Sequence, residues 1–436
     1  MEVVMLSIAE VRRMAPEDTE QQQTLGPRYV AVRRATEELC RPLATEDYGL
    51  QAMADASPPK WHLAHTTWFF ETFLLKPFLH AYSVFHPRYE YLFNSYYQTI
   101  GAQFPRPERG LLSRPTVAEV YRYRAHVDAA MARLLREASA DDFAEVARRT
   151  TLGCHHEQQH QELLLADIKY NFSLNPLRPA YRADLPEAQK PEPAPLNWID
   201  YQGGVHAVGH AGADFAFDNE LPRHSVYLRP YALAARLITC GEYLAFIRAG
   251  GYRRPDLWLA DGWRTACERG WQAPLYWEQI DGRWWQFTLA GMRPVNENEP
   301  LCHVSFYETD AYARFLGKRL PSEQEWEVAA AALPIAGNLR DNGYLHPVPA
   351  APGAFLPLQR FGDAWEWTQS AYAPYPGYRP PAGALGEYNG KFMVNQMVLR
   401  GGSCATPADH LRATYRNFFY PADRWQFSGI RLAEDR

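Results

Sequence analysis

The stretch CHHEQQHQELLL, from Cys154 to Leu165, places two histidines, His156 and His160, four positions apart. Residues at this spacing lie one turn apart on the same face of an α-helix, so their imidazoles can chelate one metal ion. The same letters spell H-E-x-x-H, the zinc-peptidase motif, in which Glu157 would be the general base. The interpretation without a metal is a solvated polar face of a helix.

A second pair of histidines lies in SPPKWHLAHTTWFFETF, residues 57–73. We expect a helix here, with Ser57 as its cap and Pro58 in its first turn. His62 and His65 fall on an aromatic face of this helix, where buried polar groups need partners. A metal would supply one. The spacing alone does not decide between His62 and His65 as the third ligand.

The residues after the first motif argue against a peptidase. QELLLADIKYN supplies neither the glycine nor the histidine of a metzincin, and no helix with a further acidic ligand follows. Glu157 is then a supporting or surface carboxylate. Three histidines from two helices leave coordination positions open for a substrate and for dioxygen. Such a set of nitrogen ligands is compatible with iron, copper or zinc, so spacing does not choose the metal.

The composition is that of a globular protein. The chain has 436 residues, of which 47% are hydrophobic and 22% charged, and its formal net charge is −5. No basic block indicates a nucleic-acid partner, and no segment is apolar enough to predict a membrane span or a secretion signal. The six cysteines form no C-x-x-C pair, which favours reduced thiols in the cytoplasm. The oligomeric state is not readable from the sequence.

Two domains are expected, in an α plus α+β fold. Residues 1–182 show helical periodicity and predict a four-helix bundle, in which Thr116 and Glu119 form a capping box. Residues 183–197 are rich in proline and predict a linker. Residues 198–436 contain eleven of the thirteen tryptophans and few long amphipathic segments, which indicates an irregular α+β domain. A second capping box, Ser322 with Glu325, predicts one of its short helices.

Long motifs in both halves resemble one known family, the sulfoxide synthases of the ergothioneine pathway. In the first half these motifs occupy residues 57–73, 91–116 and 155–168, and they look like a DinB-type metal-binding bundle. In the second half they occupy residues 301–331, 361–370 and 398–433. They are similar to the formylglycine-generating enzymes, whose domain has a C-type-lectin-like fold. The resemblance covers nearly the whole chain in the right order.

The resemblance implies a non-haem Fe(II) enzyme. Such an enzyme uses O2 to join the sulfur of cysteine or γ-glutamylcysteine to the imidazole C2 of hercynine (Nα-trimethylhistidine). It also implies that iron is bound by His65, His156 and His160, with His65 preferred to His62 because relatives keep the histidine that ends W-x-L-x-H. The catalytic cysteines of the formylglycine generators have no clear counterpart, so that activity is not expected.

The substrate contacts are also carried over from the family. Gln159 matches the residue that holds the imidazole of hercynine, and Asn417 matches an asparagine that contacts hercynine. Arg106 and Arg109 match two arginines that grip the carboxylates of the thiol, a task that suits paired guanidinium groups. Phe418 is a candidate for the cation–π contact with the trimethylammonium group.

The chain departs from the family where some relatives carry Trp-Asp after the asparagine, because Phe418 and Phe419 stand there. The proton donor must then lie elsewhere. Tyr96 and Tyr97, just ahead of the arginine pair, are the candidate catalytic tyrosines, and Tyr97 is preferred because it is nearer the arginines. The alternative is that both are packing residues.

Three other functions remain open from the sequence. A DinB-type thiol S-transferase would use the metal without redox chemistry, and oxygen dependence would separate it from a sulfoxide synthase. A binding protein would use the metal only structurally, and turnover of any thiol would exclude it. A relative that takes a selenium substrate in place of sulfur (a selenoneine synthase) is the third.

Overall fold

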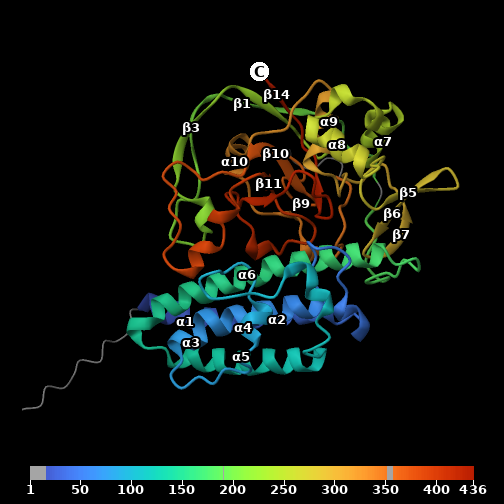
Figure 1. Ribbon diagram of the computed structural model, residues 1–436. Helices are drawn as coiled ribbons and strands as arrows, with labels where there is room; N and C mark the ends of the chain where they lie inside the picture. The colour runs from blue at the N-terminus through green and yellow to red at the C-terminus, as the bar shows by residue number, and fades with distance from the viewer. Residues whose placement is uncertain (1–15, 190, 351–356) are drawn as a thin grey trace, which may run out of the picture.

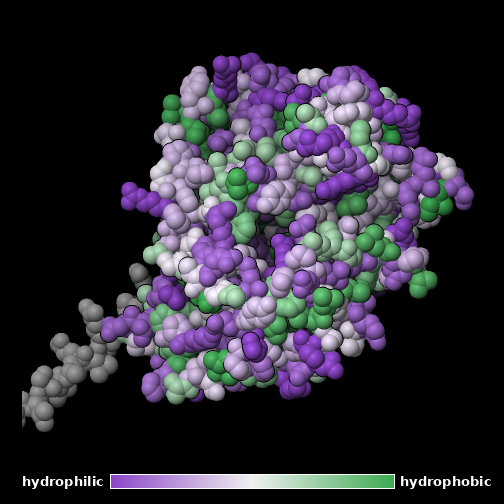
Figure 2. Space-filling view, viewed as in Figure 1, coloured by the Kyte–Doolittle hydropathy of each residue, from purple (hydrophilic) through white to green (hydrophobic). Residues whose placement is uncertain are grey.

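The computed structural model describes residues 16–189, 191–350 and 357–436, with side chains from residue 24 onward. Figure 1 shows a helical bundle formed by the first half and a second half of short strands and helices seated on one side of it, with α6 along the boundary. Figure 2 shows hydrophilic and hydrophobic residues interspersed over the same face, which is hollowed near its centre. The predicted α plus α+β fold class is confirmed.

From residue 16 onward, the bundle has four long helical segments. These are α1 (Pro16–Cys40), α2 (Pro59–Phe70), α5 (Val117–Glu137) and α6 (Ala140–Ser173). After α2 the helix runs without a break through a π-helical turn (Glu71–Leu75) into α3 (Lys76–Phe78). The connection to α5 contains α4 (Tyr89–Phe93) and a 3-10 turn (Arg106–Leu111).

In the bundle, one predicted helix start is confirmed and one is wrong. Thr116 and Glu119 form the predicted capping box at the start of α5. The predicted cap of α2 is wrong: Pro58 occupies the cap position, and no side chain bonds the first turn. Ser57 instead accepts a hydrogen bond from Arg109 through its hydroxyl. The proline already fixes the backbone for helix entry, so the serine is free to bond elsewhere.

The described residues of the second half form five small sheets. The central one has the order β12-β11-β10-β13, and β13 runs parallel to β10. Its strands are β10 (Trp365–Ala371), β11 (Met397–Arg400), β12 (Asn417–Phe419) and β13 (Ser428–Gly429). The other sheets are formed by β1 (Trp198–Tyr201), β4 (Tyr231–Ala234) and β14 (Ala433–Asp435); β2 (Gly204–Val208) and β3 (His224–Leu228); β5 (Trp277–Ile280), β6 (Arg283–Thr288) and β7 (Gly291–Pro294); and β8 (Gly337–Asn338) and β9 (Phe361–Gly362).

Four short α-helices in the described part of the second half pack around these sheets. They are α7 (Cys240–Arg248), α8 (Ala260–Glu268), α9 (Phe306–Phe315) and α10 (Glu323–Ala330). The capping box of Ser322 and Glu325 begins α10, as predicted. Between Ser173 and Trp198 the described residues form neither helix nor strand, and the predicted linker at 183–197 lies in this stretch.

The helix α6 is the element that joins the two halves. One hydrophobic core runs from the bundle into the second half. Gly153 lets α6 approach α2 closely, because a Cβ there would lie 2.5 Å from the ring of Phe70. The described helices include none with the length and apolar character that a membrane crossing needs.

Candidate active site

Three buried histidines converge between α2 and α6. His65, His156 and His160 each offer one ring nitrogen, and these atoms lie within 4.8 Å of one another. The Nε2 atoms of His65 and His156 are 3.2 Å apart. The i,i+4 spacing on α6 therefore does place two imidazoles at one point, and the facing helix α2 adds a third.

Backbone and side-chain contacts fix which nitrogen faces the centre in His65 and in His160. The Nδ1 atom of His65 lies 2.6 Å from the carbonyl oxygen of Phe93, so it carries the proton and leaves Nε2 free to bind a metal. The Nδ1 atom of His160 lies 2.9 Å from Nδ1 of His62. The other nitrogen of His62 lies 3.1 Å from a carboxylate oxygen of Asp167. His62 thus supports His160 from behind.

The histidines suit a divalent transition metal. Burial lowers the pKa of His65 and His160 well below the usual range, with the neighbouring histidines adding to it, and burial lowers the pKa of His156 to about 3. Neutral imidazoles are the form that ligates metals. Unprotonated nitrogens that face one another in a buried site are unfavourable unless something lies between them. The residues present therefore fit a metal held by three nitrogens.

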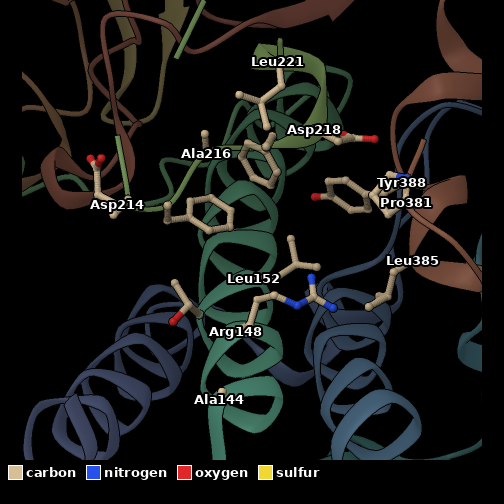
Figure 3. Close-up of a pocket in the computed structure, with 14 residues that line it drawn as sticks. Ala144, Arg148, Leu152, Asp214, Ala216, Asp218, Leu221, Pro381, Leu385 and Tyr388 are labelled. Carbon is tan, nitrogen blue, oxygen red and sulfur yellow. The ribbon is translucent and has the colours of Figure 1, made fainter. Parts of the chain in front are cut away.

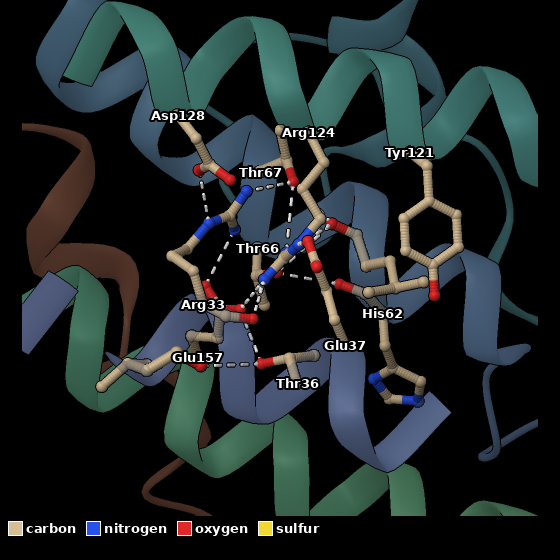
Figure 4. Close-up of polar contacts among 12 residues, drawn as sticks. Arg33, Thr36, Glu37, His62, Thr66, Thr67, Tyr121, Arg124, Asp128 and Glu157 are labelled. Atoms are coloured by element: carbon tan, nitrogen blue, oxygen red, sulfur yellow. Dashed lines mark hydrogen bonds and ion pairs between the residues drawn. The ribbon is translucent and has the colours of Figure 1, made fainter. Parts of the chain in front are cut away.

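Glu157 is fully buried in the bundle, among Arg33, Thr36 and Arg124 (Figure 4). Its carboxylate lies 2.9 Å from a guanidinium nitrogen of Arg33 and 2.5 Å from one of Arg124, and it accepts a hydrogen bond from Thr36. Burial alone raises the pKa of a carboxylate, but Arg124 and Arg33 outweigh it and lower the pKa of Glu157 to about 2. A carboxylate held in this way is a structural anchor and does not act as the general base of a peptidase.

The two predicted arginines differ in their surroundings. Arg109 is 3% exposed, and its guanidinium donates to Ser57 and Ser95 and lies 3.4 Å from the centroid of the Trp61 ring. Among the described residues no carboxylate forms an ion pair with it. Burial and the charge on Arg106 lower the pKa of Arg109 to about 8, so a bound anion would stabilise its charged form.

Arg106 is exposed and donates to the carbonyl oxygen of Asp55. The Trp61 ring, on which the guanidinium of Arg109 packs, also stacks on His65, with centroids 4.5 Å apart and planes 11° apart. Arg109 therefore lies one aromatic layer from the histidines, while Arg106 lies nearer the solvent.

Gln159 lies on α6 between the bundle and the second half. Its amide contacts the hydroxyl of Tyr415, with nitrogen and oxygen 2.6 Å apart, and its amide oxygen accepts from Tyr388. The ring of Tyr388 lies 5.6 Å from that of His156. Gln159 and Tyr388 therefore border the histidines from the side of the second half.

The two candidate tyrosines lie in a second aromatic layer. Tyr97 is fully buried, and its ring packs on Trp68, whose ring stacks on His65. Tyr96 packs on Tyr97 and lies 6.0 Å from the ring of Tyr388. Burial raises the pKa of Tyr97 well above its usual range, so this phenol stays protonated.

Asn417 and Phe418 lie on β12, and the described contacts do not connect them to the histidines. The side chain of Asn417 accepts from the backbone N–H of Phe418. The ring of Phe418 stacks on Tyr372, with centroids 4.0 Å apart. The structure brings the predicted histidines, Gln159 and the tyrosines together, and leaves these two residues at the edge of the arrangement.

Some residues of the site were not identified from the sequence in their roles. Asp167 contacts His62 and also accepts from the backbone N–H of Ser57. Its signal is the i,i+7 spacing from His160, two turns along the same face of α6. Tyr415 has no such signal, because its contact with Gln159 joins residues that are far apart in the chain.

A pocket of about 490 Å³ adjoins this region (Figure 3). Leu152 on α6 and Tyr388 from the second half line it, together with Phe215, Phe217 and Asp218. The rings of Phe217 and Tyr388 stack with centroids 5.6 Å apart. Tyr388 thus has the pocket on one side and His156 on the other.

The chain is similar to known proteins along both halves. Residues 183–348 and 341–436 match the sulfatase-modifying factor enzyme 1-like domain, and residues 28–164 match the DinB superfamily. The hercynine oxygenase of Mycolicibacterium thermoresistibile is 32% identical over 410 residues, which cover 87% of this chain and 87% of that protein. Ergothioneine biosynthesis protein 1 of Schizosaccharomyces pombe is 25% identical over 335 residues, covering 68% of this chain and 41% of that protein. Among solved structures, PvdO from Pseudomonas aeruginosa is 21% identical, with a TM-score of 0.39, over 55% of this chain and 94% of that one.

Proposed function

The chain belongs to the hercynine oxygenase family, and from this premise we propose that it is an Fe(II)- and O2-dependent sulfoxide synthase of ergothioneine biosynthesis. Its reaction joins the sulfur of cysteine or γ-glutamylcysteine to the imidazole C2 of hercynine. The observation that carries the proposal is the convergence of three neutral histidine nitrogens, within 4.8 Å of one another, in the helical domain that the family shares.

His65, His156 and His160 hold the metal in this proposal. When bound, ferrous iron supplies the redox chemistry that couples dioxygen to the thiol and the imidazole. The protein fixes the ring of His65 through the Phe93 carbonyl and that of His160 through His62, and burial excludes water from all three rings. Gln159 and Tyr388 border the histidines from the side of the second half, and the substrates would bind there.

Arg109 binds the carboxylate of the thiol substrate. It is a buried cation with no carboxylate partner among the described residues, and it is placed one aromatic ring from His65. Such a group gains more from an incoming anion than an exposed one does, because water does not already solvate it. Arg106, at the solvent side, steers the thiol and contacts the more distant carboxylate of a longer donor.

Gln159 orients the imidazole of hercynine beside His156, and Asn417 and Phe418 contact its charged end. Support for Gln159 is its place on the same turn of α6 as the ligands, with its amide held by Tyr415. Support for Asn417 and Phe418 is the family motif in which they stand, YRNFF at residues 415–419. An aromatic face such as that of Phe418 is suited to a quaternary ammonium group.

Tyr96 and Tyr97 supply the proton. Sulfur can leave the reaction coupled to hercynine as a sulfoxide, or oxidised alone as a sulfinic acid. Coupling requires that a proton reach the oxygen that is not transferred to sulfur, and a positioned phenol can act as that acid. Tyr97 is the stronger candidate, because burial keeps it protonated and only Trp68 separates it from His65.

The six cysteines of the chain are free thiols, and we place the enzyme in the cytoplasm on that ground. One experiment tests the proposed reaction. The protein is incubated with hercynine and either cysteine or γ-glutamylcysteine, after loading with Fe(II) or with zinc, in air and without oxygen. Mass spectrometry then identifies the products. A hercynine–thiol sulfoxide formed only with iron and oxygen supports the proposal, whereas equal turnover with zinc or without oxygen indicates a thiol transferase.

A further inference from the structure

A chain of hydrogen-bonding side chains leads from the surface of α1 to Gln159. A guanidinium nitrogen of Arg28 lies 2.8 Å from Nε2 of His155. The Nδ1 atom of His155 lies 2.9 Å from Nδ1 of His410, and Nε2 of His410 lies 3.0 Å from the hydroxyl of Tyr415. That hydroxyl lies 2.6 Å from the amide of Gln159. The five residues come from α1, α6 and the segment between β11 and β12.

Arg28 gives this chain a direction. A guanidinium group only donates hydrogen bonds, so Nε2 of His155 must accept and its ring proton must be on Nδ1. The Nδ1–H of His155 then donates to Nδ1 of His410, so the ring proton of His410 is on Nε2. The hydroxyl oxygen of Tyr415 therefore accepts from His410. With the opposite tautomers, Nε2–H of His155 would point at a guanidinium N–H of Arg28, and two donors would lie 2.8 Å apart.

The direction continues through the amide of Gln159. Tyr415 has one proton to donate, and among the described residues only Gln159 remains within reach to accept it. The amide oxygen must then face Tyr415, which is a rotation of the amide by half a turn that exchanges its oxygen and nitrogen. The amide nitrogen comes to face the hydroxyl of Tyr388 and donates to it. The proton of Tyr388 is left free for another acceptor.

We propose that Arg28 fixes the orientation of the Gln159 amide through His155, His410 and Tyr415, and so leaves the hydroxyl proton of Tyr388 to an acceptor atom of the bound hercynine. The proposal rests on the function given above, because it concerns the same substrate. Hercynine offers two kinds of acceptor, its carboxylate oxygens and the unprotonated nitrogen of its ring, whereas its quaternary nitrogen neither donates nor accepts. Arg28, His155 and His410 are positioning residues in this scheme.

Histidine tautomers give the first test, and they are read without turnover. The full-length protein is labelled with 15N-histidine, loaded with zinc, and studied by NMR correlation of ring nitrogens with ring protons. Signals are assigned with the His155→Gln and His410→Gln variants. The proposal expects the proton of His155 on Nδ1 and that of His410 on Nε2. The reverse pair of tautomers in the otherwise folded protein would overturn it.

Binding gives the second test. Arg28→Met removes the donor that sets the direction, Arg28→Lys keeps a donor-only cation, and Arg34→Met is the matched control on the exposed side of α1. In the zinc-loaded protein, calorimetry should show hercynine binding weakened about fivefold in Arg28→Met, the loss of about one hydrogen bond. Arg28→Lys should recover most of that loss, and cysteine binding should stay within about twofold, since the thiol is held elsewhere.

Unchanged hercynine affinity in Arg28→Met overturns the proposal even if the tautomers are as expected. So does an equal loss for hercynine and cysteine, because that indicates general disturbance of the fold. Neither result bears on whether the iron-loaded enzyme makes a sulfoxide, so failure here is distinct from failure of the proposed reaction.

Discussion

His62 lies directly behind His160, with the Nδ1 atoms of the two rings 2.9 Å apart, and its Nε2 atom contacts the carboxylate of Asp167. In the proposed site, His62 supports His160 and His65 is a ligand. Removal of a group that orients a metal ligand lowers affinity roughly 10- to 100-fold. We expect His62→Ala to weaken metal binding by about that factor, and His65→Ala to abolish it.

Equilibrium dialysis with metal analysis measures both affinities, and His80→Ala, an exposed histidine of the same half, is the control. If His65→Ala keeps the metal while His62→Ala loses it, the two roles are reversed. His160→Ala should lose both the metal and oxygen consumption.

The arginine pair should act unequally on the thiol. Arg109 is buried and without a carboxylate partner among the described residues, whereas Arg106 is exposed. Loss of one member of a buried charge pair costs roughly 2–5 kcal/mol of binding. Arg109→Ala should therefore raise the KM for the thiol by at least about 30-fold and leave that for hercynine nearly unchanged.

Arg106→Ala should have a small effect with cysteine and a larger one with γ-glutamylcysteine, whose second carboxylate reaches further. Steady-state kinetics with each substrate varied in turn measures the KM for cysteine, for γ-glutamylcysteine and for hercynine in each variant. Equal rises in the KM of thiol and hercynine in Arg109→Ala would contradict the assignment.

Glu157 should matter for stability and not for the chemical step. Glu157→Gln leaves Arg33 and Arg124 as buried charges with a partner missing, which costs roughly 3–5 kcal/mol of folding free energy. Thermal unfolding followed by circular dichroism measures the loss. Glu145→Gln, on the exposed part of the same helix, should cost less than about 1 kcal/mol. A Glu157→Gln protein with full stability and no activity would instead indicate a general base.

The contribution of Glu157 should also depend on pH. Its pKa in the folded protein, about 2, lies below the ordinary 4.5, so the stabilisation is full above pH 4.5 and is lost as pH falls through 2. The difference in unfolding temperature between the wild type and Glu157→Gln should therefore narrow below pH 4.5. A difference that stays constant down to pH 3 would mean that the carboxylate is not held as an anion.

Tyr97 should control which product forms. Tyr97→Phe keeps the ring that packs on Trp68 and removes the proton. Sulfoxide formation should slow and turnover should shift towards the sulfinic acid, with the metal content unchanged. Mass spectrometry of both products gives their ratio, and Tyr91→Phe, exposed on α4, is the control. An unchanged ratio in Tyr97→Phe, in Tyr96→Phe and in the double variant would place the acid elsewhere, with Tyr378 and Tyr388 the next to test.

The parts of the site that local periodicity determines could be predicted from the sequence. His156 and His160 converge because helical spacing alone puts them on one face, and the capping box at Thr116 needs only four consecutive residues. The choice of His65 over His62 required the family motif, because both lie on the same buried helix.

The parts that depend on distant residues could not be predicted. Whether Glu157 is exposed or buried is decided by Arg33 and Arg124, which lie on other helices. The support of His160 by His62 likewise requires the register between α2 and α6. Many strands of the second half are only two to five residues long, too short for an alternating pattern to mark them.

Successive side chains of α6 contact different parts of the protein. Gln158 and Gln159 meet the second half, His160 the histidine centre, and Gln161 the backbone of α1. Each step along an α-helix turns the side chain by about 100°. A single residue inserted after Gly153 would therefore rotate every later side chain onto its neighbour's surface. Such an insertion would exchange the face towards the three histidines, the core face and the face towards the second half at once, whereas a point substitution changes only one contact.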